Sequence, residues 1–281
     1  MANEKVFMGR KVFFLNAPTG FEKAVIDSLR SMEYEVYSIK DYRVLKEMIR
    51  LNPDSIVFII PTTALNFRGW RNFIKSFENE TIFAPLDVGI IMRKMNPERE
   101  SLFLAGVQYD AGLIYVDNGI YDAMRKIVAA LDRLNAKGIR KYVRADCKSE
   151  KSAEIYWFKG EKMLKFNIID ISSVGVAALF PARLQNDIFV NQVISSAYIN
   201  MEIVPDGTGL VERNQLPIEL KISAIKVVGE NLLVVFMYGN ETAISVIKKI
   251  REYVTYILNR NLYASIMNLP LDNIDYNVLG I

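Results

Sequence analysis

The chain has 281 residues, of which 51% are hydrophobic and 24% charged, so it is long enough for two hydrophobic cores and has the composition of a folded globular protein. A formal net charge of +3, without any dense run of Lys and Arg, gives no reason to expect a nucleic-acid polymer as partner. The sequence contains no histidine, which excludes catalytic triads, histidine-based zinc sites and phosphotransfer through histidine by this chain. We therefore expect a protein that is not an enzyme and that binds no metal ion.

The start of the chain and its single cysteine indicate the compartment. Met1 to Arg10 includes Glu4 and Lys5 and has no long apolar run, which argues against a secretory signal. No apolar segment is long enough to predict a transmembrane span. Cys147 alone cannot form an internal disulfide framework, which fits a reducing compartment. We expect a cytoplasmic protein without a transmembrane segment.

The first half of the chain alternates short apolar runs with amphipathic stretches. The apolar runs predict strands at Val12 to Leu15, Glu35 to Ile39, Ser55 to Ile60, Val88 to Met92 and Leu113 to Val116. The amphipathic stretches predict helices at Phe21 to Met32, Tyr42 to Leu51, Phe67 to Phe77 and Ile120 to Asn135. Repeated strand-helix units of this length predict an open parallel sheet with helices on both faces.

Beyond Gly138 the pattern changes to short β-rich runs separated by Gly, Asn and Asp. Strands are predicted at Glu154 to Phe158, Met163 to Ile171, Gly175 to Leu179, Tyr198 to Val204, Ile218 to Val228 and Leu232 to Tyr238. Such a series is typical of an antiparallel barrel or sandwich. An amphipathic helix at Thr242 to Leu258 follows. We therefore predict an α/β domain over residues 1–137 and a β domain with a C-terminal helix over residues 138–281.

Two arginines four residues apart, Arg140 and Arg144, immediately precede the first predicted strand of the second domain. A guanidinium is permanently charged and presents a planar fork of donors, which suits phosphate oxygens or the O6 and N7 edge of guanine. The alternative is that both arginines are solvated cations after a helix C-terminus, where the helix dipole favours positive charge.

A second short pattern, Asp170-Ile171-Ser172-Ser173-Val174-Gly175, ends an apolar strand. The period of two places Asp170 and Ser172 on one face and Ile169 and Ile171 on the other, which we expect to enter the core. A carboxylate can accept from the N1 and N2 donors of guanine, and Gly175 permits a tight bend and close approach of a ligand. In the alternative interpretation, Asp170 and Ser172 only satisfy the backbone amides of a hairpin turn.

Together the two patterns resemble the PilZ family of cyclic di-GMP receptors, whose motifs are RxxxR followed by [D/N]xSxxG. Arg140 and Arg144 match the first motif, and Asp170, Ser172 and Gly175 match the second. The resemblance covers about Gly138 to Leu262. It implies a six-stranded antiparallel β-barrel that binds cyclic di-GMP on its outer surface, with the arginines contacting phosphates and guanine and the second motif contacting a base. No further cofactor is implied.

The first half resembles a receiver domain in its strand-helix order, but not in its functional residues. The expected acids and lysine are replaced by Asn16-Ala17-Pro18 after the first strand, Pro61-Thr62-Thr63 after the third and Asp117 after the fifth. We therefore predict a phosphorylation-incompetent, receiver-like domain of flavodoxin type that serves for protein contacts.

The functional hypothesis is a cyclic di-GMP effector that passes the signal to an unidentified partner protein through a conformational change at the junction between the domains. Gly138 is the expected hinge, because glycine lacks the constraint of a Cβ atom. The alternative hypothesis is a PilZ-like scaffold or protein-interaction module that binds no nucleotide.

Overall fold

The computed structural model describes residues 9–148, 153–204, 210–271 and 273–278. The chain divides into two compact units. The first unit comprises Met1–Lys141 together with Tyr263–Ile281, and the second comprises Tyr142–Leu262.

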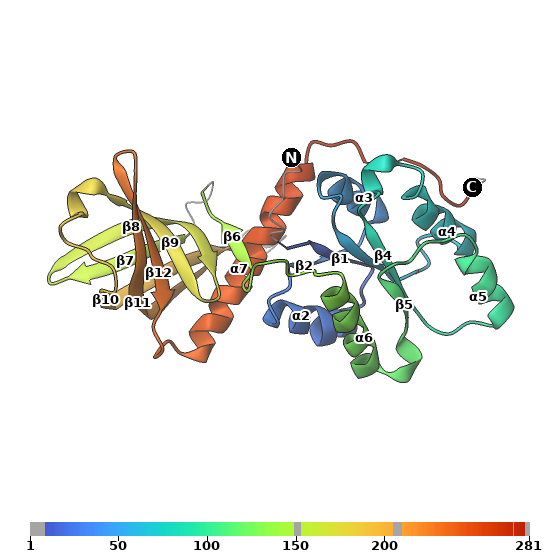
Figure 1. The fold of residues 1–281 in the computed structure, drawn as a ribbon, viewed down its shortest axis with the longest axis horizontal. Helices are drawn as coiled ribbons and strands as arrows, with labels where there is room; N and C mark the ends of the chain where they lie inside the picture. The colour runs from blue at the N-terminus through green and yellow to red at the C-terminus, as the bar shows by residue number, and fades with distance from the viewer. Residues whose placement is uncertain (1–8, 149–152, 205–209, 272, 279–281) are drawn as a thin grey trace. The chain divides into compact units, whose positions relative to one another are not determined.

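The first unit contains a parallel sheet, which has five strands in the described part of the chain (Figure 1). The strands are β1 (Val12–Leu15), β2 (Val36–Ile39), β3 (Ile56–Ile59), β4 (Asp87–Met92) and β5 (Gly112–Tyr115), in the spatial order β2-β1-β3-β4-β5. All four pairings are parallel, with β1 lying between β2 and β3. This is the flavodoxin-like order, whose connection changes direction between β1 and β3. The predicted open parallel sheet is confirmed.

Helices cover both faces of this sheet, with α2 and α6 on one side and α3 and α4 on the other (Figure 1). The helical segments are α1 (Thr19–Phe21), the π-helical turn η1 (Glu22–Ile26), α2 (Asp27–Ser31), α3 (Tyr42–Leu51), α4 (Phe67–Ser76), η2 (Thr81–Phe83), α5 (Pro97–Leu104), η3 (Val116–Asn118) and α6 (Ile120–Arg133). The predicted helix at Phe21 to Met32 therefore occurs as three joined pieces. α5 was not predicted, because Phe103 is its one buried residue and no apolar stripe marks it.

Side-chain caps determine where three of these helices begin. Asp41 accepts a hydrogen bond from the amide of Arg43 at the start of α3. Asn66 and Asn96 act in the same way at the starts of α4 and α5. Each cap satisfies a backbone donor that has no partner within the helix, which is worth about 1 kcal/mol per helix.

A buried arginine holds the amino end of the sheet. Arg10 is 7% exposed, and its Nη1 atom lies 2.6 Å from Oδ2 of Asp87. Its remaining nitrogens donate to the carbonyl oxygens of Asp54, Ser55 and Pro85 at 2.5, 3.0 and 3.0 Å. The charge is therefore compensated and hydrogen-bonded, as a buried cation requires.

The end of the chain packs on the first unit through Tyr276, which is 0% exposed. Its hydroxyl accepts from Nζ of Lys46 at 2.7 Å, and its carbonyl accepts from Nδ2 of Asn72 at 2.9 Å. The predicted second domain, residues 138–281, differs from the observed second unit in this segment. The reason is a contact with α3 and α4 about two hundred positions earlier, which no local sequence pattern reports.

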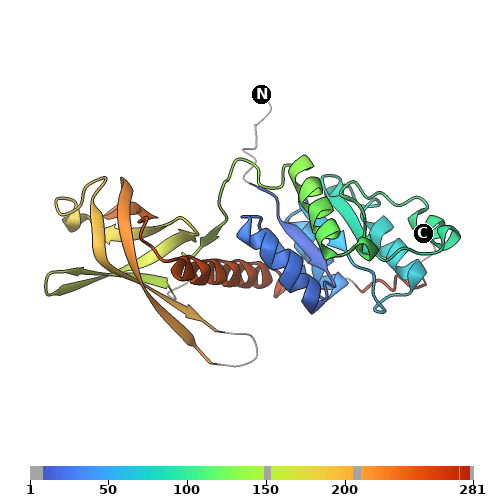
Figure 2. The same ribbon diagram turned by 90° about the horizontal axis from the view of Figure 1, so that it is seen from below.

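The second unit is an antiparallel β-barrel (Figures 1 and 2). Its strands are β6 (Arg144–Asp146), β7 (Ala153–Lys159), β8 (Lys162–Ser172), β9 (Gly175–Pro181), β10 (Val193–Ile203), β11 (Glu212–Val228) and β12 (Asn231–Tyr238), with a 3₁₀ turn η4 (Ala182–Leu184). Within the described residues, the order β8-β7-β10-β11-β12-β9 is closed by the pairing of β8 with β9, and β6 pairs with the end of β8. The predicted six-stranded antiparallel barrel is confirmed, and β6 is a further short strand that was not predicted.

Alternating residues fill the barrel, as Leu232, Val234 and Phe236 of β12 show by being fully buried. The helix α7 (Ile244–Ile266) contributes Ile250, Val254 and other apolar residues to the same core. It is longer than the predicted Thr242 to Leu258. In the described part of the chain, no helix has the length and apolar character needed to cross a bilayer.

Candidate functional site

The register between β6 and β8 brings the two sequence motifs together. Arg144 lies directly opposite Ser172, and Asp146 lies directly opposite Asp170. Cross-strand partners of an antiparallel pair project to the same face, as do residues two apart on one strand. Arg144 and Asp170 therefore belong to one group on the outer face, while Ala145 and Ile171 between them are fully buried in the barrel core.

A bulge in β8 adjusts which residues face the core. The pairing of β8 with β9 shifts between Ile168 and Asp170. Ile168 and Ile171 are 1% and 0% exposed, whereas Ile169 is only half-buried. The prediction that Ile171 enters the core is confirmed, and Ile168 takes the place expected for Ile169 because the bulge adds one residue to the alternation.

The turn after β8 uses the side chain of Ser172. This residue is 3% exposed, and its hydroxyl donates to the carbonyl of Gly175 at 3.1 Å. The same oxygen accepts from the amide of Val174 at 3.4 Å. The arrangement matches the alternative interpretation of this motif, in which the hydroxyl satisfies backbone groups of a hairpin turn.

Gly175 is needed for close packing of two strands. A Cβ atom at this position would lie 2.2 Å from the carbonyl oxygen of Phe236. Gly175 is the cross-strand partner of Met237 on β12, so the two backbones approach where a side chain would stand. Packing against strand β12 therefore explains why a glycine occupies this position. Close approach of a ligand here stays a prediction.

Tyr238, at the end of β12, contacts the turn and was not predicted from the sequence. Its hydroxyl donates to the carbonyl of Ser172 at 3.1 Å, and its amide donates to the carbonyl of Val174 at 3.1 Å. Burial raises the pKa of the Tyr238 hydroxyl, and electrostatic interactions with Cys147 and Asp170 raise it further. The phenol therefore stays a neutral donor beside Asp170 at ordinary pH.

Asp146 is a second carboxylate of the outer face. It is directly opposite Asp170, and it accepts from the amide of Lys148 at 2.8 Å. Its own carbonyl accepts from Nδ2 of Asn261 on α7 at 3.0 Å. The spacing of two from Arg144 could have indicated this residue, because alternate residues of an extended segment share a face.

The arginines of the first motif are both exposed. Arg144 begins β6 in the second unit, whereas Arg140 is among the last residues of the first unit before that boundary. The structure therefore places Arg144, Asp170, Ser172 and Gly175 at the β6, β8 and β9 strands of the barrel. Arg140 is related to them by the sequence motif.

At the carboxyl ends of the parallel strands, the first unit carries the residues that replaced the receiver acids. Asn16 follows β1 with a left-handed φ of 62°, and Pro61 to Thr63 follow β3. Asp117 follows β5 and accepts from the amide of Lys94 at 2.6 Å. In the described residues, no group of three Asp, Glu, His or Cys side chains is arranged to hold a metal ion.

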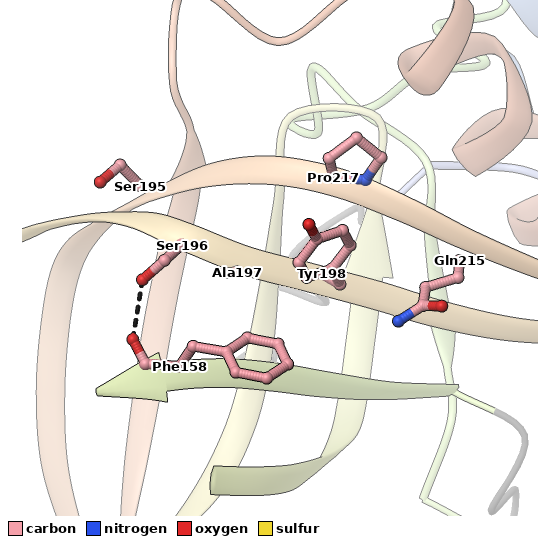
Figure 3. A pocket seen from close by; sticks show the side chains of 7 residues that line it. All are labelled: Phe158, Ser195, Ser196, Ala197, Tyr198, Gln215 and Pro217. Atoms are coloured by element: carbon pink, nitrogen blue, oxygen red, sulfur yellow. Dashed lines mark hydrogen bonds between the residues drawn. The ribbon is translucent and has the colours of Figure 1, made fainter. Parts of the chain in front are cut away.

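An open groove of about 490 Å³ lies on another part of the barrel surface, at β7, β10 and β11 (Figure 3). It is lined by Phe158, Ser195, Ser196, Ala197, Tyr198, Gln215 and Pro217. The groove occurs beside a bulge of β10, where Oγ of Ser196 donates to the carbonyl of Phe158 at 2.8 Å. None of the residues of the two motifs lines it.

No protein-family profile matches the sequence, and no curated protein matches it. Similar solved structures include the motility inhibitor MotI/DgrA of Bacillus subtilis, with 18% identity, a TM-score of 0.33, and coverage of 44% of this chain and 51% of that one. The PilZ domain of YcgR from Escherichia coli with c-di-GMP has 14% identity, a TM-score of 0.33, and coverage of 47% and 99%. The signal receiver domain of the response regulator NarL from Mycobacterium tuberculosis has 18% identity, a TM-score of 0.32, and coverage of 45% and 97%.

The matches to the PilZ domain of YcgR and to the NarL receiver domain each cover less than half of this chain. The chain spans about half the length of MotI/DgrA. The position of Arg144 opposite the second motif comes from the strand register of this chain itself.

Proposed function

We propose that this protein is a cyclic di-GMP effector whose ligand binds on the outer face of the barrel at β6 and β8. The observation that supports this most is the register that pairs Arg144 with Ser172 and Asp146 with Asp170. It combines an exposed guanidinium with carboxylates on one face, although the two motifs are separated by 26 residues in the chain. We assign the ligand contacts to Arg140, Arg144 and Asp170.

The chemistry of the ligand fits this group of side chains. Cyclic di-GMP has two phosphates and two guanines, so it presents anionic oxygens and donor-acceptor edges together. A guanidinium can bind phosphate oxygens or the O6 and N7 atoms of guanine in a bidentate manner, and a carboxylate can accept from N1 and N2. Binding requires no catalytic step. Ser172 and Gly175 contribute by shaping the turn beside Asp170, since both are committed to backbone contacts.

Calorimetric titration with cyclic di-GMP tests the proposal. Arg144→Ala should weaken binding by about 1–3 kcal/mol, the scale of one bidentate contact to guanine. Arg140→Ala should have an effect of the same order, and the double variant should not bind detectably. Arg213→Ala is the matched control, because Arg213 is an exposed arginine on β11 that pairs with Glu202 at 2.9 Å. Equal affinities of the Arg144→Ala and Arg213→Ala variants would contradict the assignment.

We further propose that the ligand signals through the segment that joins the two units. Gly138 adopts a left-handed φ of 57°, which costs glycine little and other residues more. Binding at Arg140 and Arg144 would order the adjoining segment, and a change from disorder to order is a recognised means of switching. Amide exchange across Ala136 to Arg144 should slow when cyclic di-GMP is added. Protection restricted to β8 and β9 would contradict a signal through the junction.

A second candidate function is a PilZ-like scaffold that binds proteins and no nucleotide. It is favoured by the fact that contacts within the barrel explain both Ser172 and Gly175 without a ligand. A barrel could keep these two residues after losing its ligand. The same titration decides between the functions, because a scaffold would show no heat of binding with the wild-type protein.

A further inference from the structure

Tyr238, at the end of β12, makes two hydrogen bonds to the turn that joins β8 to β9. Tyr238 donates its hydroxyl hydrogen to the carbonyl of Ser172 at 3.1 Å and its amide hydrogen to the carbonyl of Val174 at 3.1 Å. These two bonds reach both sides of the turn. Since Gly175 also packs against the backbone of β12, the turn is fixed by β12 at three neighbouring positions.

The hydroxyl of Ser172 makes hydrogen bonds within the turn, whereas Tyr238 provides the contact with β12. The Ser172 hydroxyl donates to the carbonyl of Gly175 and accepts from the amide of Val174. The hydroxyl of Tyr238 supplies a hydrogen bond from β12 to the carbonyl of Ser172, the last residue of β8. Loss of such a hydrogen bond costs about 1 kcal/mol and would loosen the end of β8 beside the turn.

Asp170 lies two residues before Ser172 on the same face of β8. It is close enough to Tyr238 for its charge to act on the phenol. A shift of the end of β8 would therefore move the carboxylate that we assign to guanine. Small displacements matter here, because a bidentate contact requires both pairs of atoms to be aligned.

We propose that Tyr238 is a positioning residue of the cyclic di-GMP site, which fixes the turn from Ser172 to Gly175 and thereby the carboxylate of Asp170. This inference rests on the proposed function for its ligand. It assigns Tyr238 no contact with the nucleotide. Because Tyr238 acts through Asp170, loss of its hydroxyl should change the preference between bases as well as the affinity. A general contribution to stability would not change that preference.

The test compares Tyr238→Phe, which removes only the hydroxyl, with Tyr198→Phe on the groove side of the barrel. Tyr238→Phe should raise the Kd for cyclic di-GMP by about 3- to 10-fold, as the loss of one hydrogen bond predicts. Its preference for cyclic di-GMP over cyclic di-AMP should fall by a similar factor, because Asp170 reads the guanine edge. Tyr198→Phe should change neither quantity. A Tyr238→Phe variant with unchanged preference would overturn the inference.

A double-mutant cycle separates positioning from general destabilisation. If Tyr238 acts through Asp170, Tyr238→Phe should change Kd by less than about twofold in an Asp170→Ala background. An undiminished effect in that background would refute the inference. Amide exchange at Val174 and Gly175 in the absence of nucleotide should also be faster in Tyr238→Phe. That measurement tests the hold on the turn even if the wild-type protein binds no cyclic di-GMP, a result that would overturn the proposed function alone.

Discussion

Replacing Gly175 by alanine should destabilise the barrel, because the new Cβ atom has no room. It would lie 2.2 Å from the carbonyl oxygen of Phe236 and 3.4 Å from Cα of Met237. Both neighbours are backbone, so rotation of a side chain cannot relieve the contact. A normal carbon-oxygen separation requires β9 and β12 to move apart by about 1 Å.

The size of the effect follows from two terms. Overpacking of a tight interior site costs about 1–3 kcal/mol. Separation of the strands also weakens the bond from the amide of Tyr238 to the carbonyl of Val174, which is worth about 1 kcal/mol. Gly175→Ala should therefore lower the free energy of unfolding of the barrel by about 2–4 kcal/mol.

Amide exchange of the slowest-exchanging residues in β9 and β12 measures this free energy in the barrel itself. Gly160→Ala is the control, because Gly160 lies in a hairpin of the same barrel with a φ of +60° and no atom within 4 Å of its Cβ position. It should cost only the left-handed backbone penalty of about 1–2 kcal/mol. If Gly175→Ala is no more destabilising than Gly160→Ala, the strand-packing explanation is wrong.

Three further predictions concern other parts of the chain. Asp170→Ala should reduce the preference for cyclic di-GMP over cyclic di-AMP more than it reduces affinity for either, measured by competition; an unchanged preference would show that another residue reads the base. Hydrogen bonds from Lys126 and then Arg125 lower the pKa of Asp122 to about 2, so its contribution to stability should be present above its ordinary value of 3.8 and disappear as pH falls through about 2. A carboxyl titration by NMR that stays near 2 in Lys126→Ala would contradict this cause. Tyr276→Ala should lower the unfolding free energy of the first unit by about 3–5 kcal/mol, since it removes a buried ring and the partner of Lys46; an unchanged melting temperature would show that the segment is not held there.

The candidate site could be predicted only in part, because some of its residues share short sequence motifs and others come together only through strand pairing. Arg144, Asp170 and Ser172 were found through their spacing in two short motifs. Tyr238, which contacts the turn from the end of β12, lies 66 positions beyond Ser172 and belongs to no motif. Its contact follows from the pairing of β9 with β12, which brings the end of β12 to the turn. Sequence separation of this size leaves no local signal.

The sequence by itself determined the elements with a regular apolar pattern. The amphipathic stretch Ile120 to Asn135 predicted the helix α6, and its Ile127 and Leu131 are fully buried. The alternation in the second half likewise predicted six strands, because a half-buried strand must repeat every two residues. α5 escaped prediction, since a helix that buries only Phe103 has no such pattern.

Only the tertiary structure decided how these elements meet. It closed the barrel through the pairing of β8 with β9 and placed Asp146 opposite Asp170. It also joined the end of the chain to the first unit through Tyr276, and it showed that Gly175 is required by the backbone of β12. The physical reason is common to all of these cases. Periodicity states which face of an element is buried, whereas strand register and close packing depend on partners that are far away in the chain.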